Sequence, residues 1–390
     1  MARIWERPIG ELAGLEYSCS CGRDHRVDIQ AIRVGRGCIQ ELPDLLKSLG
    51  ARQVFLLADS FTYEAAGKQV ELLLETAGIP YHTRLFKNQT PLVPNEYALG
   101  SALAAMENQD DMLLAVGSGT LNDLAKYLSA RTGVPYVIAA TAPSMDGYAS
   151  TVAPMILDGI KTTLPAVYPT AIVADIDIMK EAPMPMLTAG LGDILGKITA
   201  LCDWQLSRQL FGEYYCEEAA TLVERALEKC VENAQGLAQR DPKAVQAVTE
   251  ALILSGVAMG LVGNSRPASG AEHHMAHYWE MDALKRGEEH PLHGNAVGVA
   301  SVISASLYEL AAEKLPQGFT PPDKEKILRC LKAAGACVTP KELGIRRDLC
   351  LEAILHAMRM RDRFTILRLL DREGLLSACA IELTNQFYSE

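Results

Sequence analysis

The chain has 390 residues, more than the roughly 250 to 300 at which one hydrophobic core usually stops growing, so two domains are expected. Hydrophobic residues make up 49% and charged residues 22%, as in ordinary globular proteins. The formal net charge of −11, without a basic run, argues against nucleic acid or an anionic membrane surface as the main partner.

The first residues hold no apolar signal-like segment, and the longest apolar runs fall short of the roughly 20 residues that span a bilayer. We therefore expect a cytoplasmic protein without a membrane span. Its ten cysteines are then expected to be reduced thiols rather than a disulfide framework.

The first cysteines form a small cluster of potential ligands with a histidine: Cys19, Cys21 and His25. A zinc knuckle is one interpretation. A CxC pair without a second close pair is not a standard zinc spacing, however, so a β-hairpin is favoured for residues 17–38.

Apolar runs and helical patterns alternate over the next part of the chain. Strands are expected at 53–58, 81–86, 112–116, 134–139 and 171–174. Helices are expected at 41–50, 63–77 and 95–106, and directly after the turn that follows residue 116. This alternation predicts a parallel sheet with helices on both faces.

Near residue 175 the pattern changes to long amphipathic helices with almost no candidate strand, including helices over 216–240 and 245–261. We therefore predict two domains: an α/β, Rossmann-like nucleotide-binding domain over 1–178 and a helical metal- and substrate-binding domain over 179–390.

The turn after the strand at 112–116 contains Gly117 and Gly119 and leads into a helix. Such a turn allows backbone N–H groups to approach a phosphate at the positive end of the helix. A Gly-Ser-Gly turn is also common as a simple tight connection. Asp59 ends an earlier strand, where a carboxylate can accept hydrogen bonds from ribose hydroxyls, and this favours a dinucleotide.

Polar residues also follow the strand at 134–139. Thr141, Ser144 and Ser150 are candidates for nucleotide binding, and Asp146 for substrate binding, because ligands bind at the carboxyl ends of strands in open α/β sheets. An ordinary turn rich in Ser, Asp and Gly explains this stretch equally well.

Histidines are concentrated between residues 265 and 299. His273 and His277 are four residues apart and therefore lie on one face of a helix, and His293 follows a connection with turn residues that returns the chain towards them. Three protein ligands and an open position are typical of a catalytic metal site. Asp193 is the candidate carboxylate. The alternatives are a helix with surface histidines and an aspartate that caps a helix.

Four motifs occur in order along the chain: TAPSMDGYAS at 141–150, AGLGDILGK at 189–197, SRPASGAEHHMAH at 265–277 and HG at 293–294. Together they resemble the sn-glycerol-1-phosphate dehydrogenase family. That family belongs to a metal-dependent branch of polyol dehydrogenases with glycerol dehydrogenase and, more distantly, dehydroquinate synthase. The segment with Cys19, Cys21 and His25 looks like the bacterial form.

The resemblance implies metal ligands at Asp193, His273 and His293, and Asp146, Asp193 and His277 near the substrate. It implies nucleotide contacts from two loops and one strand end: Asp59, Gly117, Gly119, Thr120, Leu121, Asn122, Asp123, Thr141, Ala142, Pro143, Ser144 and Ser150. The implied cofactors are NAD(P) and one divalent ion per subunit, nickel or zinc, in a homodimer or higher homo-oligomer. His274, about 100° away from His273 around the helix, is the alternative ligand.

The implied reaction is the reversible reduction of dihydroxyacetone phosphate to sn-glycerol 1-phosphate, a precursor of glycerophospholipids. Arg266 is the candidate for the substrate phosphate, and a structural ion pair explains it equally well. Glycerol dehydrogenase needs no phosphate site, so the SRPASG segment argues against it. A lyase like dehydroquinate synthase needs several cations, in which this region looks poor. The third alternative is a nucleotide-binding protein without catalytic activity. It is disfavoured because the candidate aspartate and the three histidines are all present together.

Overall fold

A six-stranded parallel sheet forms the centre of the N-terminal part of the computed structural model, which describes residues 3–389. The strand order is β3-β10-β7-β6-β4-β5, and every neighbouring pair is parallel. The strands are β3 Ala31–Gly35, β4 Val54–Asp59, β5 Tyr81–Phe86, β6 Met112–Gly117, β7 Tyr136–Ala140 and β10 Ala171–Asp175.

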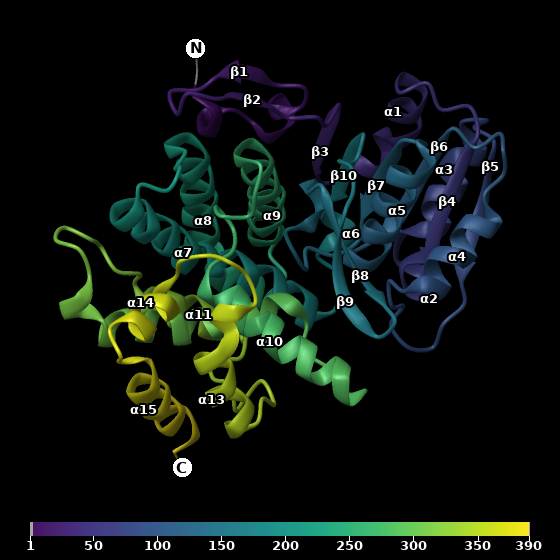
Figure 1. Cartoon of the computed structure of the whole chain (residues 1–390). Helices are drawn as coiled ribbons and strands as arrows, with labels where there is room; N and C mark the ends of the chain where they lie inside the picture. Colours follow the sequence, from purple (N-terminus) through teal and green to yellow (C-terminus); the bar gives the residue numbers. More distant parts are fainter. Residues whose placement is uncertain (1–2, 390) are drawn as a thin grey trace.

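Helices cover both faces of this sheet (Figure 1). In β4, Leu56 packs in the cluster that contains the apolar side chains of α1 (Leu42–Ser48) and α3 (Lys68–Thr76). Phe55 and Leu57 pack on the other side, with α4 (Glu96–Ala105) and α5 (Gly119–Thr132). Because alternate residues of a strand point to opposite faces, this two-sided burial confirms the predicted fold class.

The structure differs from the predicted elements at β3 and in the helix after β4. β3 pairs with β10 at the edge of the sheet, whereas the sequence interpretation placed residues 17–38 in a hairpin. The helix predicted over 63–77 begins earlier, as α2 (Ser60–Thr62), and passes through a π-helical turn at Tyr63–Gly67 before α3.

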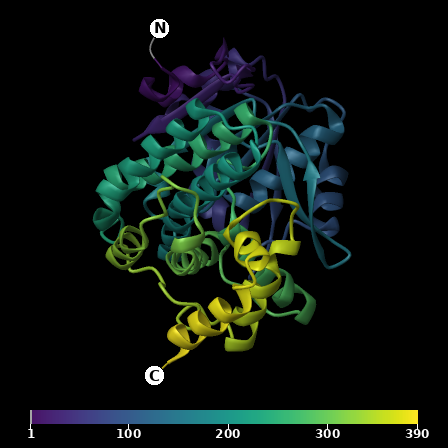
Figure 2. The ribbon, with the colours of Figure 1, turned by 60° about the vertical axis from the view of Figure 1, so that its left-hand side comes forward.

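Two antiparallel hairpins lie outside the main sheet. β1 (Glu16–Ser18) pairs with β2 (Asp24–Arg26), as the hairpin prediction required. β8 (Val152–Leu157) pairs with β9 (Ile160–Pro165) through the positive-φ residues Asp158 and Gly159. The N-terminal hairpin lies beside α8 and α9, at one end of the helical part (Figure 1). The C-terminal helices lie at the other end of the helical part (Figures 1 and 2).

Helices make up the rest of the described chain, and residues 176–389 form no strand. They are α6 Ile176–Met179, α7 Met184–Phe211, α8 Glu217–Leu237, α9 Pro242–Val262, α10 Ala271–Arg286, α11 His293–Leu310, α12 Lys324–Ala333, α13 Arg347–His356, α14 Ile366–Arg372 and α15 Leu376–Tyr388. α7 and α11 cross at very short distance. A Cβ on Gly192 would lie 2.3 Å from the Gly294 carbonyl oxygen, and one on Gly294 would lie 1.9 Å from that of Ala189.

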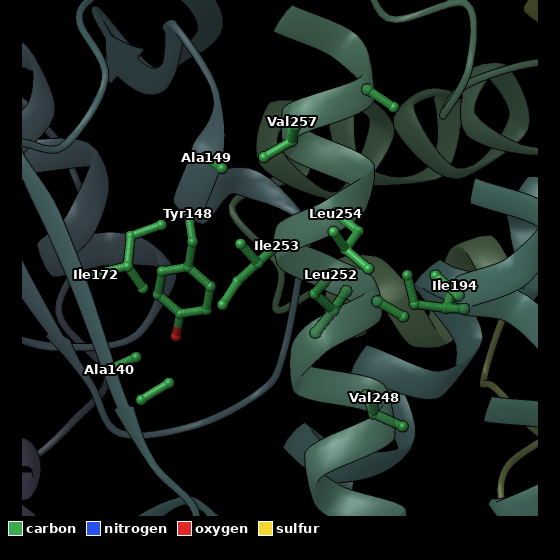
Figure 3. Close-up of a cluster of buried hydrophobic side chains, with 14 of the residues drawn as sticks. Ala140, Tyr148, Ala149, Ile172, Ile194, Val248, Leu252, Ile253, Leu254 and Val257 are labelled. Atoms are coloured by element: carbon green, nitrogen blue, oxygen red, sulfur yellow. The ribbon is translucent and has the colours of Figure 1, made fainter. Parts of the chain in front are cut away.

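α9 packs against the α/β part of the structure. Its Ile253 and Val257 face Tyr148 and Ala149 of the loop after β7 (Figure 3). The helix has 21 residues and its most apolar window has a mean hydropathy of 1.7, so by length and composition it could cross a membrane, although the sequence analysis expected no run of that length. However, 78% of its most apolar window is buried inside the protein, as in the core helix of a globular fold.

Candidate metal and nucleotide sites

Three residues from three helices converge on one point. Asp193 lies in α7, His273 lies in α10, and His293 is the first residue of α11. One potential ligand atom from each lies within 4.8 Å of the others, and His273 Nε2 is 3.5 Å from Asp193 Oδ1. Ligands about 2.1 Å from a tetrahedral ion lie about 3.4 Å apart, so this spacing suits a divalent ion.

Two buried glutamates orient the imidazoles. Glu272 Oε1 lies 2.8 Å from Nδ1 of His273, and Glu280 Oε1 lies 2.8 Å from Nδ1 of His293. A carboxylate on Nδ1 fixes the tautomer in which Nε2 carries the free lone pair, as in many metal sites. The donor set and its outer carboxylates therefore fit a divalent ion.

A second group, His277, Glu280 and His293, also has its ligand atoms within 4.8 Å. Here Glu280 is already engaged: it bonds Nδ1 of both histidines and accepts from Lys161 Nζ at 2.6 Å. The group containing Asp193 is therefore the better candidate. His274 is fully buried, neither of its ring nitrogens has a hydrogen-bond partner among residues 3–389, and it belongs to neither group.

A buried lysine joins the two candidate aspartates. Lys197 Nζ donates to Asp193 Oδ1 at 2.6 Å and lies 2.8 Å from Asp146 Oδ2. The Asp146 N–H donates to Asp193 Oδ2 at 3.0 Å, and Ser255 Oγ donates to Asp146 Oδ2 at 3.0 Å. Burial opposes ionisation of Asp193, but the nearby Lys197 cation holds the pKa of Asp193 below its ordinary value. The sequence interpretation gave Lys197 no role.

A cavity of about 820 Å³ opens beside these groups. Asp146, His273, His277 and His293 are among its lining residues. His277 Nδ1 lies 3.1 Å from Glu280 Oε2, and burial lowers the pKa of His277 to about 3, which keeps the ring neutral near pH 7. His277 is thus a neutral hydrogen-bonding group next to the three converging ligands.

Two arginines that the sequence interpretation missed line the same cavity. Arg361 Nη1 donates to Ser265 Oγ at 3.1 Å, and Arg363 donates to Ser265 Oγ at 2.7 Å and to the Ser269 carbonyl at 2.9 Å. Within residues 3–389, no carboxylate pairs with either guanidinium. They follow the short helix Ala357–Arg359, in a region where sequence offered only helices.

Arg266, the sequence candidate for a phosphate contact, is not in this cavity. It is 3% exposed, its Nε donates to Glu213 Oε1 at 2.7 Å, and its Nη1 donates to the Phe364 carbonyl at 3.0 Å. The structural ion pair is therefore the correct interpretation. The expectation that the site is poor in cations is also wrong, since Lys161, Arg361 and Arg363 line the cavity.

The nucleotide candidates lie at a topological switch point. β4 and β6 are neighbours, although β5 follows β4 in the chain and pairs on its other side. Open α/β sheets bind ligands in the crevice at such a point, beyond the carboxyl ends of the strands. Asp59 ends β4, Gly117 ends β6, and α5 begins at Gly119. Asp59 Oδ1 already accepts from the N–H groups of Phe61 and Thr62, as a helix cap.

The other nucleotide candidates surround the start of α5. Gly117 is paired with Ala140, and its carbonyl accepts from the Thr141 N–H at 3.0 Å, which brings the second candidate loop alongside. Three of the candidates line the cavity: Thr120, Asp123 and Ser150. The others do not line it: Asp59, Gly117, Gly119, Leu121, Asn122, Thr141, Ala142, Pro143 and Ser144.

Within this loop region some side chains are engaged internally. Asn122 Nδ2 donates to the Gly147 carbonyl at 3.1 Å. Fully buried Lys126 donates to Asp123 Oδ1 at 3.3 Å and to Ser150 Oγ at 3.0 Å. These bonds leave backbone groups, rather than the Asn122 and Asp123 side chains, as the better candidates for contacts with a ligand.

Comparison with known proteins identifies the family of the chain. Residues 33–183 match the family model described as iron-containing alcohol dehydrogenase. A glycerol-1-phosphate dehydrogenase, NAD(P)+, of Halalkalibacterium halodurans is 37% identical over 375 residues, covering 90% of this chain and 94% of that protein. An enzyme of the same name from Methanosarcina barkeri is 35% identical, covering 86% and 89%.

Solved structures show the same fold at lower identity. A probable glycerol dehydrogenase from Sinorhizobium meliloti matches with a TM-score of 0.67 and 20% identity, over 90% of this chain and 97% of that one. A 1,3-propanediol oxidoreductase matches with a TM-score of 0.70 and 16% identity, over 92% and 98%. From the sequence relatives, the chain belongs to the glycerol-1-phosphate dehydrogenase family, a group of NAD(P)-dependent oxidoreductases.

Proposed function

We propose that this protein catalyses the reversible, NAD(P)H-dependent reduction of dihydroxyacetone phosphate to sn-glycerol 1-phosphate, which supplies a glycerophospholipid precursor. The observation that carries the proposal is the shared cavity. It is lined by two of the candidate metal ligands, by Thr120 from the nucleotide-binding edge of the sheet, and by Arg361 and Arg363. The metal ligands suit the carbonyl of the substrate, the edge of the sheet suits the nucleotide that donates hydride, and the arginines suit the phosphate.

Asp193, His273 and His293 would hold a divalent ion, which acts as a Lewis acid for a carbonyl or alcohol oxygen when bound. Lys197 keeps Asp193 ionised and fixes the distance between Asp193 and Asp146. In this proposal Asp146 orients a substrate hydroxyl. His277, held by Glu280, either fixes the other hydroxyl or relays the proton.

Arg361 and Arg363 are the proposed phosphate ligands. An unpaired guanidinium that is half-buried is a costly arrangement unless an anion completes it, and a planar fork matches phosphate oxygens. The Ser265 hydroxyl accepts from both guanidinium groups and the Ser269 carbonyl accepts from Arg363, which holds them in place before substrate arrives. This is the specific observation that favours a phosphorylated substrate over free glycerol or dihydroxyacetone.

For the nucleotide, we propose that the adenine ribose lies by Asp59 and that the pyrophosphate lies at the start of α5, with the loop 141–150 on its other side. The switch point between β4 and β6 and the N-terminus of α5 support this placement. We also propose that residues 1–178 and 179–390 are the two functional domains, with nickel or zinc as the ion.

The experiment is an NADH or NADPH oxidation assay of the purified protein with dihydroxyacetone phosphate, with and without added Ni²⁺ or Zn²⁺. Metal-dependent turnover of the phosphorylated ketone is the expected result. Equal turnover of unphosphorylated dihydroxyacetone in this assay, or equally efficient oxidation of glycerol with NAD+ in the reverse direction, would instead favour a glycerol dehydrogenase.

A further inference from the structure

Four potential metal ligands meet at a second place, and none of the four lines the cavity. Cys19, Cys21 and His25 come from the N-terminal hairpin, and Cys216 immediately precedes α8. One ligand atom from each lies within 4.8 Å of all the others. Three of the four residues are at least nine-tenths buried, and Cys21 is partly exposed.

The distances suit a tetrahedral ion with thiolate and imidazole ligands. Cys19 Sγ is 3.8 Å from Cys216 Sγ, and His25 Nε2 is 3.3 Å from the sulfurs of both Cys21 and Cys216. Zinc at about 2.3 Å from sulfur and about 2.05 Å from nitrogen places tetrahedral ligands about 3.8 Å (S to S) and about 3.6 Å (S to N) apart. The Cys19–Cys216 separation is also far longer than a disulfide bond of about 2.05 Å.

The backbone is arranged to present these sulfurs. Gly22, with φ of +85°, turns the chain sharply after Cys21, and the Cys21 N–H points to Cys19 Sγ at 3.5 Å. The Ala219 N–H donates to Cys216 Sγ at 3.4 Å. Such N–H groups aimed at sulfur stabilise thiolates, and the Tyr214 hydroxyl, 3.2 Å from Cys21 Sγ, adds another polar partner.

We propose that Cys19, Cys21, His25 and Cys216 bind one zinc ion as a structural site, separate from the candidate catalytic site. Four protein ligands close the coordination sphere, as structural zinc sites require, whereas the site at Asp193 offers three and no sulfur. On binding, the three thiols release their protons to solvent and His25 coordinates as neutral imidazole, with no change of oxidation state.

The ion would fasten the N-terminal hairpin to the helical part. The segments that it joins are 191 to 197 residues apart, so the cross-link closes a very long loop and restricts the unfolded chain. It also fixes the connection between α7, which carries Asp193, and α8. Arg23 strengthens the same junction. Its guanidinium carbon lies 3.5 Å from the centre of the Tyr214 ring, and its Nη1 donates to the Val262 carbonyl at the end of α9.

The test uses the full-length protein reconstituted with Co²⁺, because a thiolate-to-cobalt charge-transfer band reports only a site that contains cysteine. We expect this band in wild type and in a His273→Ala/His293→Ala variant, which lacks two candidate catalytic ligands. Cys216→Ser and Cys21→Ser should lose the band and one equivalent of zinc by elemental analysis, while Cys337→Ser, a partly exposed cysteine elsewhere, should keep both.

Several outcomes would overturn the proposal. These are a cobalt-loaded wild type without the band, a Cys21→Ser protein with wild-type zinc content, or a native mass lower by two hydrogens that indicates a Cys19–Cys216 disulfide. The wild-type spectrum decides the question even if a variant fails to fold. An inactive protein that shows the cobalt band would contradict only the proposed catalytic function. An active protein that lacks the band would contradict only the proposed structural zinc site.

Discussion

Replacement of Arg363 by methionine tests the phosphate assignment, because methionine keeps much of the apolar stem and removes the charged fork. The structure holds this guanidinium with two hydrogen bonds, to Ser265 and Ser269, in the wall of the cavity. A hydrogen bond to a charged group contributes roughly 1.5 to 3 kcal/mol. At about 1.4 kcal/mol per factor of ten, Arg363→Met should lower kcat/KM for dihydroxyacetone phosphate by about 10- to 150-fold.

The assay compares dihydroxyacetone phosphate with unphosphorylated dihydroxyacetone. The loss of kcat/KM should appear only with the phosphorylated substrate, so the ratio of kcat/KM for the two substrates should fall by the same factor. Arg361→Met should show the same change. Arg359→Met, an exposed neighbour outside the cavity wall, is the matched control. Equal losses on both substrates would mean that Arg363 supports the fold or the ketone, and no loss would mean that the phosphate binds elsewhere.

Three further predictions concern the metal, the nucleotide and a buried carboxyl. Asp193→Asn, His273→Ala and His293→Ala should each lose the catalytic metal by elemental analysis, while their circular dichroism spectra stay native and His274→Ala keeps its metal. If His274→Ala lost the metal and His273→Ala kept it, the ligand would be His274 instead of His273. Wild type should prefer NADH, and Asp59→Ser should narrow the preference, since a carboxylate at the ribose repels a 2′-phosphate; a wild type that favours NADPH tenfold would remove Asp59 from the ribose. Burial and the nearby Glu272 raise the pKa of Asp203 to about 7, so the folded state binds a proton that the unfolded state releases between about pH 4 and pH 7. Stability should therefore fall as pH rises through that window, by about 4 kcal/mol at most, and the slope should flatten in Asp203→Asn; an unchanged slope in urea titrations would refute this origin.

Much of the α/β part could be predicted because each buried strand is a short apolar run bounded by turn residues. β5 begins and ends at the predicted residues, Tyr81 and Phe86, and the helices after β4 and β6 follow their strands closely. β3 was missed because it is short and follows a segment rich in cysteine and charged residues. Its place in the sheet depends on pairing with β10, about 140 residues later, which leaves no local signal.

Spacing along a helix predicted that His273 and His277 share a face and that a turn returns His293 to them, whereas the ligand set Asp193, His273 and His293 came from the family resemblance. The glutamates that orient the imidazoles were not recognised. A signal was available, because Glu280 stands three residues after His277 and therefore on the same side of α10.

Residues brought in by tertiary structure could not be predicted at all. Cys216 lies 191 residues from His25, and Arg361 and Arg363 reach the cavity from a loop near the C-terminus. Arg266 was a candidate for the phosphate because it stands in a motif, with a structural ion pair as an equal alternative. The sequence could not decide between the two, because its partner Glu213 is 53 residues away. Sequence spacing predicts neighbours on one helix but not which distant loop completes a site.

The product of the reaction tests the central claim most directly. A metal ion at Asp193, polar contacts from Asp146 and His277, and a phosphate held by the two arginines would define a handed pocket, because three anchor points fix which face of the ketone receives hydride. The purified protein is incubated with NADH and dihydroxyacetone phosphate, and the product is assayed with an enzyme specific for sn-glycerol 3-phosphate and by chiral chromatography. The account predicts sn-glycerol 1-phosphate alone. A racemic or 3-phosphate product would contradict it even if every metal ligand proved correct.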